Sequence, residues 1–96
     1  PTEVTALVNE GIEVTKFFPA AQYGGLATIR ALASVFVGHR FMPTGGVNAE
    51  NLKDYLADPA IIACGGTWMC KPAMIRAGEF GRICELSREA AAIVRG

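Results

Sequence analysis

Hydrophobic and polar positions alternate along the chain with two different periods. Short stretches rich in β-branched and aromatic residues, such as 12–18 (IEVTKFF), predict strands. Stretches with apolar residues three or four positions apart, such as 80–95, predict amphipathic helices. The expected strands lie at 12–18, 40–43 and 61–64. Four helices are expected at 2–10, about 25–37, 72–77 and about 80–95. A fifth helix begins at its cap, Asn48, and ends at Asp58-Pro59.

The order of these elements, one helix and then three strand–helix units, indicates an α/β fold with a parallel sheet and right-handed crossovers. Three parallel strands leave both sheet edges unpaired. A complete (β/α)8 TIM barrel takes about 200–250 residues, whereas this chain has 96. We therefore expect residues 1–96 to be a partial single domain, the C-terminal part of a TIM barrel whose N-terminal strands are absent. The start at a proline, with no methionine, agrees with this expectation.

The composition argues against several classes of function. Nine basic and nine acidic side chains give a net charge of zero, so neither nucleic acid nor an anionic membrane is an expected partner. No apolar run approaches the roughly 20 residues of a membrane span, and there is no signal-peptide pattern. Cys64, Cys70 and Cys84 lack the spacing of a zinc site, so we interpret them as reduced thiols of a cytoplasmic protein that pack as small hydrophobes. His39, the single histidine, lies outside any nucleophile motif, which favours a loop or structural role.

Lys16 stands out within the first strand, because an ammonium group has no place in a packed core without a partner or a task. It is flanked by Val14, Phe17 and Phe18 and lies near the carboxyl end of the strand, where α/β sheets and barrels carry their chemistry. An amine held in an apolar pocket loses its proton more readily and can form a Schiff base with a carbonyl at neutral pH. The alternative is a lysine that extends from an edge strand into solvent, and this segment alone favours that alternative.

Each strand is followed by a Gly-Gly pair, and two of these pairs, Gly45-Gly46 and Gly65-Gly66, indicate an anion site. Backbone N–H groups of a glycine loop that leads into a helix can surround a phosphate. Thr67 adds a hydroxyl to the second loop, and Thr44 is placed to bind a carboxylate or to cap the next helix. Two tight turns would explain the same glycines equally well. Lys16, Thr44 and Thr67 come from different strand ends, so they could converge on one pocket.

The stretches KFFPA with its central Lys16, PTGGV after the second strand and GGTW after the third closely resemble the family of 2-keto-3-deoxy-6-phosphogluconate (KDPG) aldolase and 4-hydroxy-2-oxoglutarate aldolase. The spacing fits without an insertion, and the likeness extends over the whole chain, from the opening PTE to the AGEF…REAA helix. The resemblance implies a class I (Schiff-base) aldolase on a (β/α)8 barrel, a lyase that needs no metal or other cofactor and is usually a homotrimer. It also implies cleavage of KDPG to pyruvate and glyceraldehyde 3-phosphate in the Entner–Doudoroff pathway, and possible cleavage of 4-hydroxy-2-oxoglutarate to pyruvate and glyoxylate.

The same resemblance assigns roles by position. Lys16 matches the Schiff-base lysine, Phe18 matches an aromatic residue of the substrate channel, and Thr44 matches a residue that binds the pyruvate carboxylate. The phosphate-binding positions are matched by Gly45, Gly46, Gly66 and Thr67, the last of which is often serine in the family. The family's acid/base glutamate and its carboxylate-binding arginine belong to early strands that this chain does not contain. Glu3, Glu10 and Glu13 are not expected to replace that glutamate, since they fall in a helix, a turn and the start of a strand.

Two other functions stay open from the residues. One is a non-catalytic, phosphate-binding half-barrel fragment, which predicts phosphate binding without imine formation. The other is a different phosphate-binding TIM-barrel enzyme with a structural Lys16, which predicts a full-length protein that borohydride does not trap with a carbonyl substrate. Trp68 and Tyr55 are interpreted as packing residues, with a pocket wall as the alternative for Trp68.

Overall fold

Apart from the third predicted strand, the elements follow one another as the sequence pattern predicts. The computed structural model describes all 96 residues, Pro1 to Gly96. All five predicted helices are present, and the strand predicted at 40–43 is confirmed at both ends. The elements are α1 (Thr2–Asn9), β1 (Val14–Phe17), α2 (Gly25–Val35), β2 (Arg40–Pro43), α3 (Leu52–Leu56), α4 (Pro72–Arg76) and α5 (Phe80–Arg95).

β1 is shorter than the strand predicted at 12–18. The N–H of Ile12 donates to the carbonyl of Leu7 at 3.0 Å, so residue 12 still belongs to the turn that ends α1. At its other end the strand stops before the turn at Phe18-Pro19. The extended segment that carries Lys16 is therefore four residues long.

α3 begins later than expected, at Leu52 rather than directly after Asn48. The Asn48 side chain accepts the N–H groups of Glu50 at 3.0 Å and Asn51 at 2.9 Å, as a capping side chain would. These hydrogen bonds close a turn ahead of the helix, because asparagine side chains compete with helical pairing for nearby N–H groups.

The sheet has two paired strands, not the three that the sequence predicts. β1 and β2 run parallel, with Lys16 opposite Met42. The segment 61–65 follows β2 through isolated bridges only, Phe41 with Ile61 and Thr44 with Gly65. The second bridge is displaced by one residue relative to the first, as in a β-bulge, so no continuous ladder forms at the strand predicted at 61–64.

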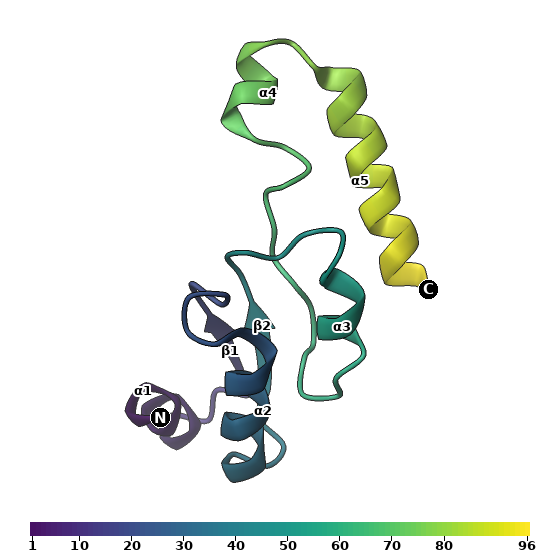
Figure 1. Cartoon of the computed structure of the whole chain (residues 1–96). Coiled ribbons are helices and arrows are strands. Elements are labelled where there is room, and N and C mark those ends of the chain that lie inside the picture. The colour runs from purple at the N-terminus through teal and green to yellow at the C-terminus, as the bar shows by residue number, and fades with distance from the viewer.

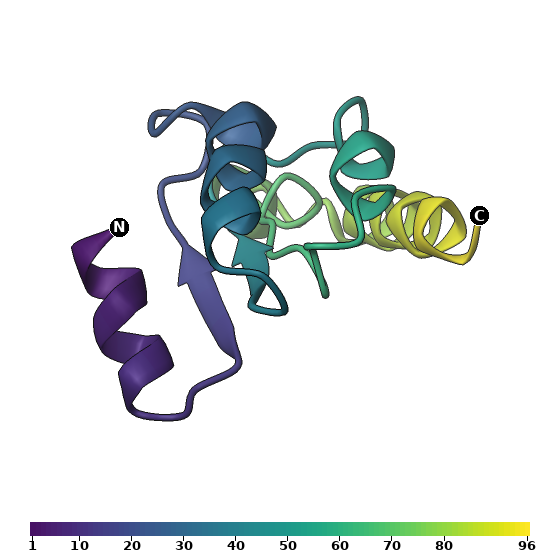
Figure 2. The same cartoon turned by 90° about the horizontal axis from the view of Figure 1, so that it is seen from below.

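The core lies on one face of this sheet. Phe41 is fully buried at the centre, α2 covers its side of the strands, and α3 lies beside α2 (Figure 2). The cluster consists of Val4, Ile29, Phe41, Val47, Leu52, Tyr55, Ile61 and Ala90. Because side chains alternate along a strand, Lys16 and Met42 belong to the opposite face, which no element of the chain covers.

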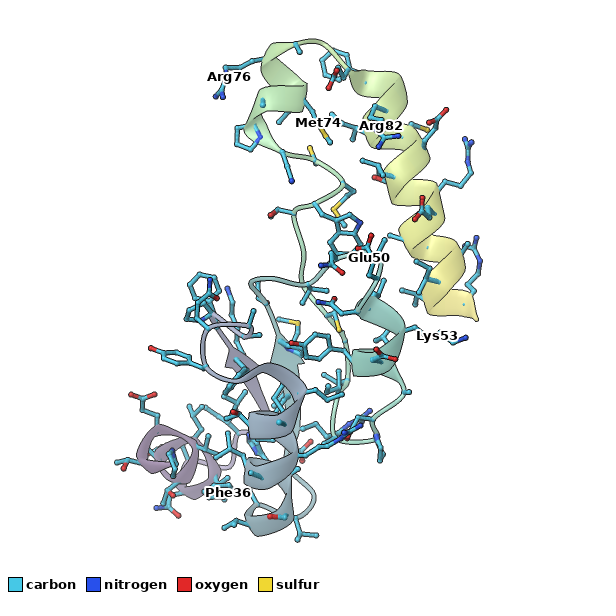
Figure 3. The ribbon with its side chains drawn as sticks, viewed as in Figure 1. Phe36, Glu50, Lys53, Met74, Arg76 and Arg82 are labelled. Atoms are coloured by element: carbon cyan, nitrogen blue, oxygen red, sulfur yellow. The ribbon has the colours of Figure 1, made fainter.

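α4 and the first half of α5 extend away from this core, while the second half of α5 returns beside α3, where Ala90 is buried (Figure 1). α4 has no buried residue, and Arg76 points away from α5 (Figure 3). The radius of gyration is 15.0 Å, whereas a compact domain of this length has roughly 12 Å. No helix is long and apolar enough to cross a bilayer.

Candidate functional site: a lysine and two glycine loops at the strand ends

Lys16 lies on the uncovered face of the sheet and is exposed. Its Nζ atom lies 5.3 Å from the centroid of the Phe18 ring, within the range of a cation–π contact. Phe18 is itself 59% exposed. Phe17 faces the opposite side of the strand from Lys16. The apolar pocket predicted around Lys16 is therefore not formed within these residues.

A hollow of about 560 Å³ runs along the outer edge of β1, between α1 and α2. Lys16 and Phe18 line it together with Tyr23, and most of the remaining lining is apolar. Glu3 is the single carboxylate in this lining, and no sequence pattern predicts that it lies near Lys16. Glu3 makes no ion pair with the lysine. The one salt bridge of the chain joins Arg30 and Asp58.

The loop after β2 is locked to the loop after β1 by backbone hydrogen bonds. The N–H of Thr44 donates to the carbonyl of Phe17 at 2.9 Å, and the carbonyl of Thr44 accepts the N–H of Ala20 at 2.8 Å. The carbonyl of Gly45 accepts the N–H of Ala21 at 3.2 Å. The first glycine loop is therefore held directly beside the end of the Lys16 strand.

Gly45 and Gly46 have φ values of +96° and +77°, in the left-handed region that favours glycine. A Cβ at position 46 would also lie 2.4 Å from the Cβ of Ala21, which is far inside van der Waals contact. Both the backbone conformation and the close approach of the neighbouring loop require glycine at position 46.

The second glycine loop lies against the first. The N–H of Gly65 donates to the carbonyl of Pro43 at 2.9 Å, and a Cβ at Gly65 would lie 2.7 Å from Thr44 Oγ1. The structure thus brings Thr44, Gly45, Gly46 and the Gly65–Gly66 segment side by side at the carboxyl ends of the strands. None of them belongs to the hollow that Lys16 and Phe18 line, so the predicted single pocket is not closed within this chain.

Several backbone donors of these loops have no acceptor in the protein. The N–H groups of Gly45, Gly46, Gly66 and Thr67 make no hydrogen bond to any other residue. Free N–H groups on adjacent glycine loops form an anion-binding concavity, because each can donate to the same negatively charged oxygens. Thr67 is exposed, so its hydroxyl is available beside them.

The cysteines contribute no nucleophile to this region. Burial raises the pKa of the Cys64 thiol to about 11, so the thiol is protonated at neutral pH. Burial also raises the pKa of Tyr55, with a smaller contribution from Cys64. Cys64 packs against the core as a small hydrophobe, but Cys70 and Cys84 are exposed, and the packing interpretation is wrong for these two. Cys70 lies in the segment that leads into α4, and Cys84 lies in the first half of α5, both away from the core (Figure 1).

His39 is structural, as the sequence suggested. It is buried, and its ring nitrogen is hydrogen-bonded to the hydroxyl of Thr15 on the core side of β1. Its ring also meets Phe41 edge-on, with the centroids 5.3 Å apart. The histidine therefore lies at the opposite end of the strands from the glycine loops. No group of three or more histidine, cysteine or carboxylate side chains is placed to hold a metal ion.

A parallel α/β unit with a lysine on one strand and free N–H donors on the next two loops combines a candidate nucleophile for carbonyl groups with donors that can bind an anion. The family model for KDPG and KHG aldolase matches residues 1–86. The chain belongs to that family. It is 44% identical over 93 residues to a 2-dehydro-3-deoxy-phosphogluconate aldolase of Treponema pallidum, and 38% identical over 89 residues to the KHG/KDPG aldolase of Escherichia coli.

These matches cover 97% and 93% of this chain but only 44% and 42% of the two relatives. The chain also matches only part of a solved structure of KDPG aldolase from Legionella pneumophila with pyruvate captured as a covalent carbinolamine intermediate. Its TM-score is 0.85 at 34% identity, over 96% of this chain and 43% of that chain. The chain thus spans less than half the length of the relatives it matches.

Proposed function

We infer that the protein is part of a class I aldolase that cleaves KDPG to pyruvate and glyceraldehyde 3-phosphate, and that also accepts 4-hydroxy-2-oxoglutarate. One observation carries this inference: the end of the Lys16 strand is hydrogen-bonded to a glycine loop with free N–H donors, in a chain of the KDPG and KHG aldolase family. The likeness to known KDPG and KHG/KDPG aldolases and the carbinolamine in the Legionella structure support it.

In this proposal Lys16 is the covalent catalyst. Its neutral amine attacks the C2 carbonyl, and loss of water gives an imine whose protonated form withdraws electrons from the neighbouring carbon. The C3–C4 bond then breaks, its electron pair enters the enamine, and the C4 hydroxyl loses its proton as the aldehyde forms. Protonation of C3 and addition of water release pyruvate and restore the amine.

The remaining predicted residues bind the two ends of the substrate. Thr44 is assigned to the carboxylate, and Phe18 to the wall of the channel beside Lys16. The phosphate is assigned to Gly45, Gly46, Gly66 and Thr67, whose free N–H groups support this role. The acid/base group and the carboxylate-binding arginine are assigned to strands outside these 96 residues.

We also propose that the chain is the C-terminal part of a (β/α)8 barrel. Two observations support this. The carbonyls of Glu13 and Phe17 accept N–H groups of the β2 side, so the backbone groups of Val14 and Lys16 between them point to the free edge of β1. The groove beside that edge is apolar, as a site for a further parallel strand would be. From the likeness to the family, we further propose a homotrimer, a cytoplasmic location and a place in the Entner–Doudoroff pathway.

The first test is intact-mass spectrometry of the protein before and after treatment with pyruvate and borohydride. The untreated mass distinguishes a 10.2 kDa chain from a longer product. A reduced pyruvate adduct should map to Lys16, be absent from Lys16→Arg, and spare Lys53 and Lys71. Labelling of all three lysines at equal rates would refute a special role for Lys16.

A second function, phosphate binding without catalysis, is favoured by a separate observation. The free donors of the two loops all belong to this chain, whereas Lys16 is exposed on an uncovered face. Saturable phosphate binding together with no adduct in a protein of the relatives' full length would favour this alternative.

A further inference from the structure

Trp68 lies against the Cα atom of Gly66 in the second glycine loop. A Cβ added to Gly66 would come within 2.1 Å of the indole Cζ3 atom and 2.5 Å of Cε3. The indole therefore occupies the space that a side chain at position 66 would need. Gly66 has no positive φ, so the approach of the ring, and not the backbone conformation, is what requires glycine here.

The ring is also held from the other side. Trp68 is half-buried and packs against the core cluster, so it lies between that cluster and the loop. The two peptide planes that meet at the Cα of Gly66 carry the N–H groups of Gly66 and Thr67. Both are free donors of the anion site. A flat ring against this Cα restricts the rotation of both planes, which a glycine would otherwise allow freely.

We propose that Trp68 is a positioning residue of the phosphate site, and that its indole fixes the direction of the Gly66 and Thr67 N–H groups. This inference rests on the proposed phosphate role of those donors. Trp68 acts through Gly66 and does not itself contact the anion. Ordering the donors before binding spares the phosphate the conformational cost of ordering a glycine.

The test is a titration of the 96-residue chain with inorganic phosphate, followed by calorimetry and, in the parent protein, by the fluorescence of its single tryptophan. Trp68→Leu keeps an apolar side chain but removes the flat ring, and we expect a Kd weaker by roughly fivefold. Trp68→Phe keeps a ring and should recover most of the affinity. Leu32→Ala, which removes packing against the same core from α2, should leave the Kd unchanged.

A double-mutant cycle separates positioning from general packing. Gly66→Ala places a methyl group against the indole and should weaken phosphate binding in the parent chain. In the Trp68→Leu background the same change should cost much less, because the ring is gone. Unchanged affinity in Trp68→Leu, or simple addition of the two effects, would overturn the positioning role alone. No phosphate binding by the parent chain would remove the phosphate site and this inference together, while the borohydride test of Lys16 would stand.

Discussion

Gly46 allows a stability test in which two costs can be separated. Its φ of +77° costs a non-glycine residue about 1–2 kcal/mol. A Cβ at this position would also lie 2.4 Å from the Cβ of Ala21, and overpacking of this kind costs about 1–3 kcal/mol. We therefore expect Gly46→Ala to lower the free energy of unfolding by about 2–5 kcal/mol, a large part of the roughly 5–15 kcal/mol typical of a domain.

Gly78 is the matched control for the backbone term. Its φ is +72°, and no atom lies within 4 Å of the position of a Cβ. Gly78→Ala should therefore lower the free energy of unfolding only by the cost of the left-handed conformation, about 1–2 kcal/mol. In the Gly46→Ala background, Ala21→Gly removes the methyl group that the new Cβ meets. The free energy of unfolding should then rise by the amount that separates Gly46→Ala from Gly78→Ala.

Urea unfolding followed by far-ultraviolet circular dichroism measures these differences as shifts of the midpoint at constant slope. Equal losses for Gly46→Ala and Gly78→Ala would show that the first glycine loop does not pack on the loop after β1. The same conclusion would follow if Ala21→Gly gave no recovery. Either result would remove the contact that holds the Gly45 and Gly46 N–H donors beside the Lys16 strand.

Two further predictions concern titration. Cys64 should react with iodoacetamide far more slowly than Cys70 at about pH 8, because burial raises the Cys64 pKa to about 11, and equal rates by mass spectrometry would contradict that burial. Since this pKa lies above the ordinary 9.0, the free energy of unfolding should also fall as pH rises from about 9 to about 11. The pKa of Asp58 is lowered by the N–H of Ala60 and then by Arg30, so its stabilising effect is complete above 3.8 and is lost as pH falls below that value. Asp58→Asn should flatten the acid side of the stability profile, and an unchanged profile would refute the assignment.

The sequence predicts most of the fold because helix ends and turns depend on local chemistry. The periodic apolar residues and the glycine and proline positions place α2 and α5 almost without error. The third strand fails because its pairing depends on a one-residue shift between the bridges at Ile61 and Gly65, and local composition does not encode that shift. The late start of α3 has a similar origin, since the Asn48 side chain closes a turn where a helical turn was expected.

The candidate site was predictable as a set of residues but not as a set of contacts. Lys16 and the glycine pairs stand out by residue type and position. The contact of Gly46 with Ala21 joins loops that are far apart in the sequence, and no periodicity reveals it. The structure confirms Trp68 as a packing residue, but its contact with Gly66 depends on the path of the loop in space. Two glycines in similar sequence surroundings thus have different reasons to be glycine.

The two parts of the proposed chemistry depend on different regions of the protein. The proposed anion site consists of backbone groups of two loops, and hydrogen bonds and packing within these 96 residues position them. The reactivity of Lys16 depends on what surrounds its amine, and in this chain that face of the sheet is uncovered. Phosphate affinity should therefore be a property of the chain alone. Efficient imine formation should require additional strands that pair with the free edge of β1 and enclose the lysine.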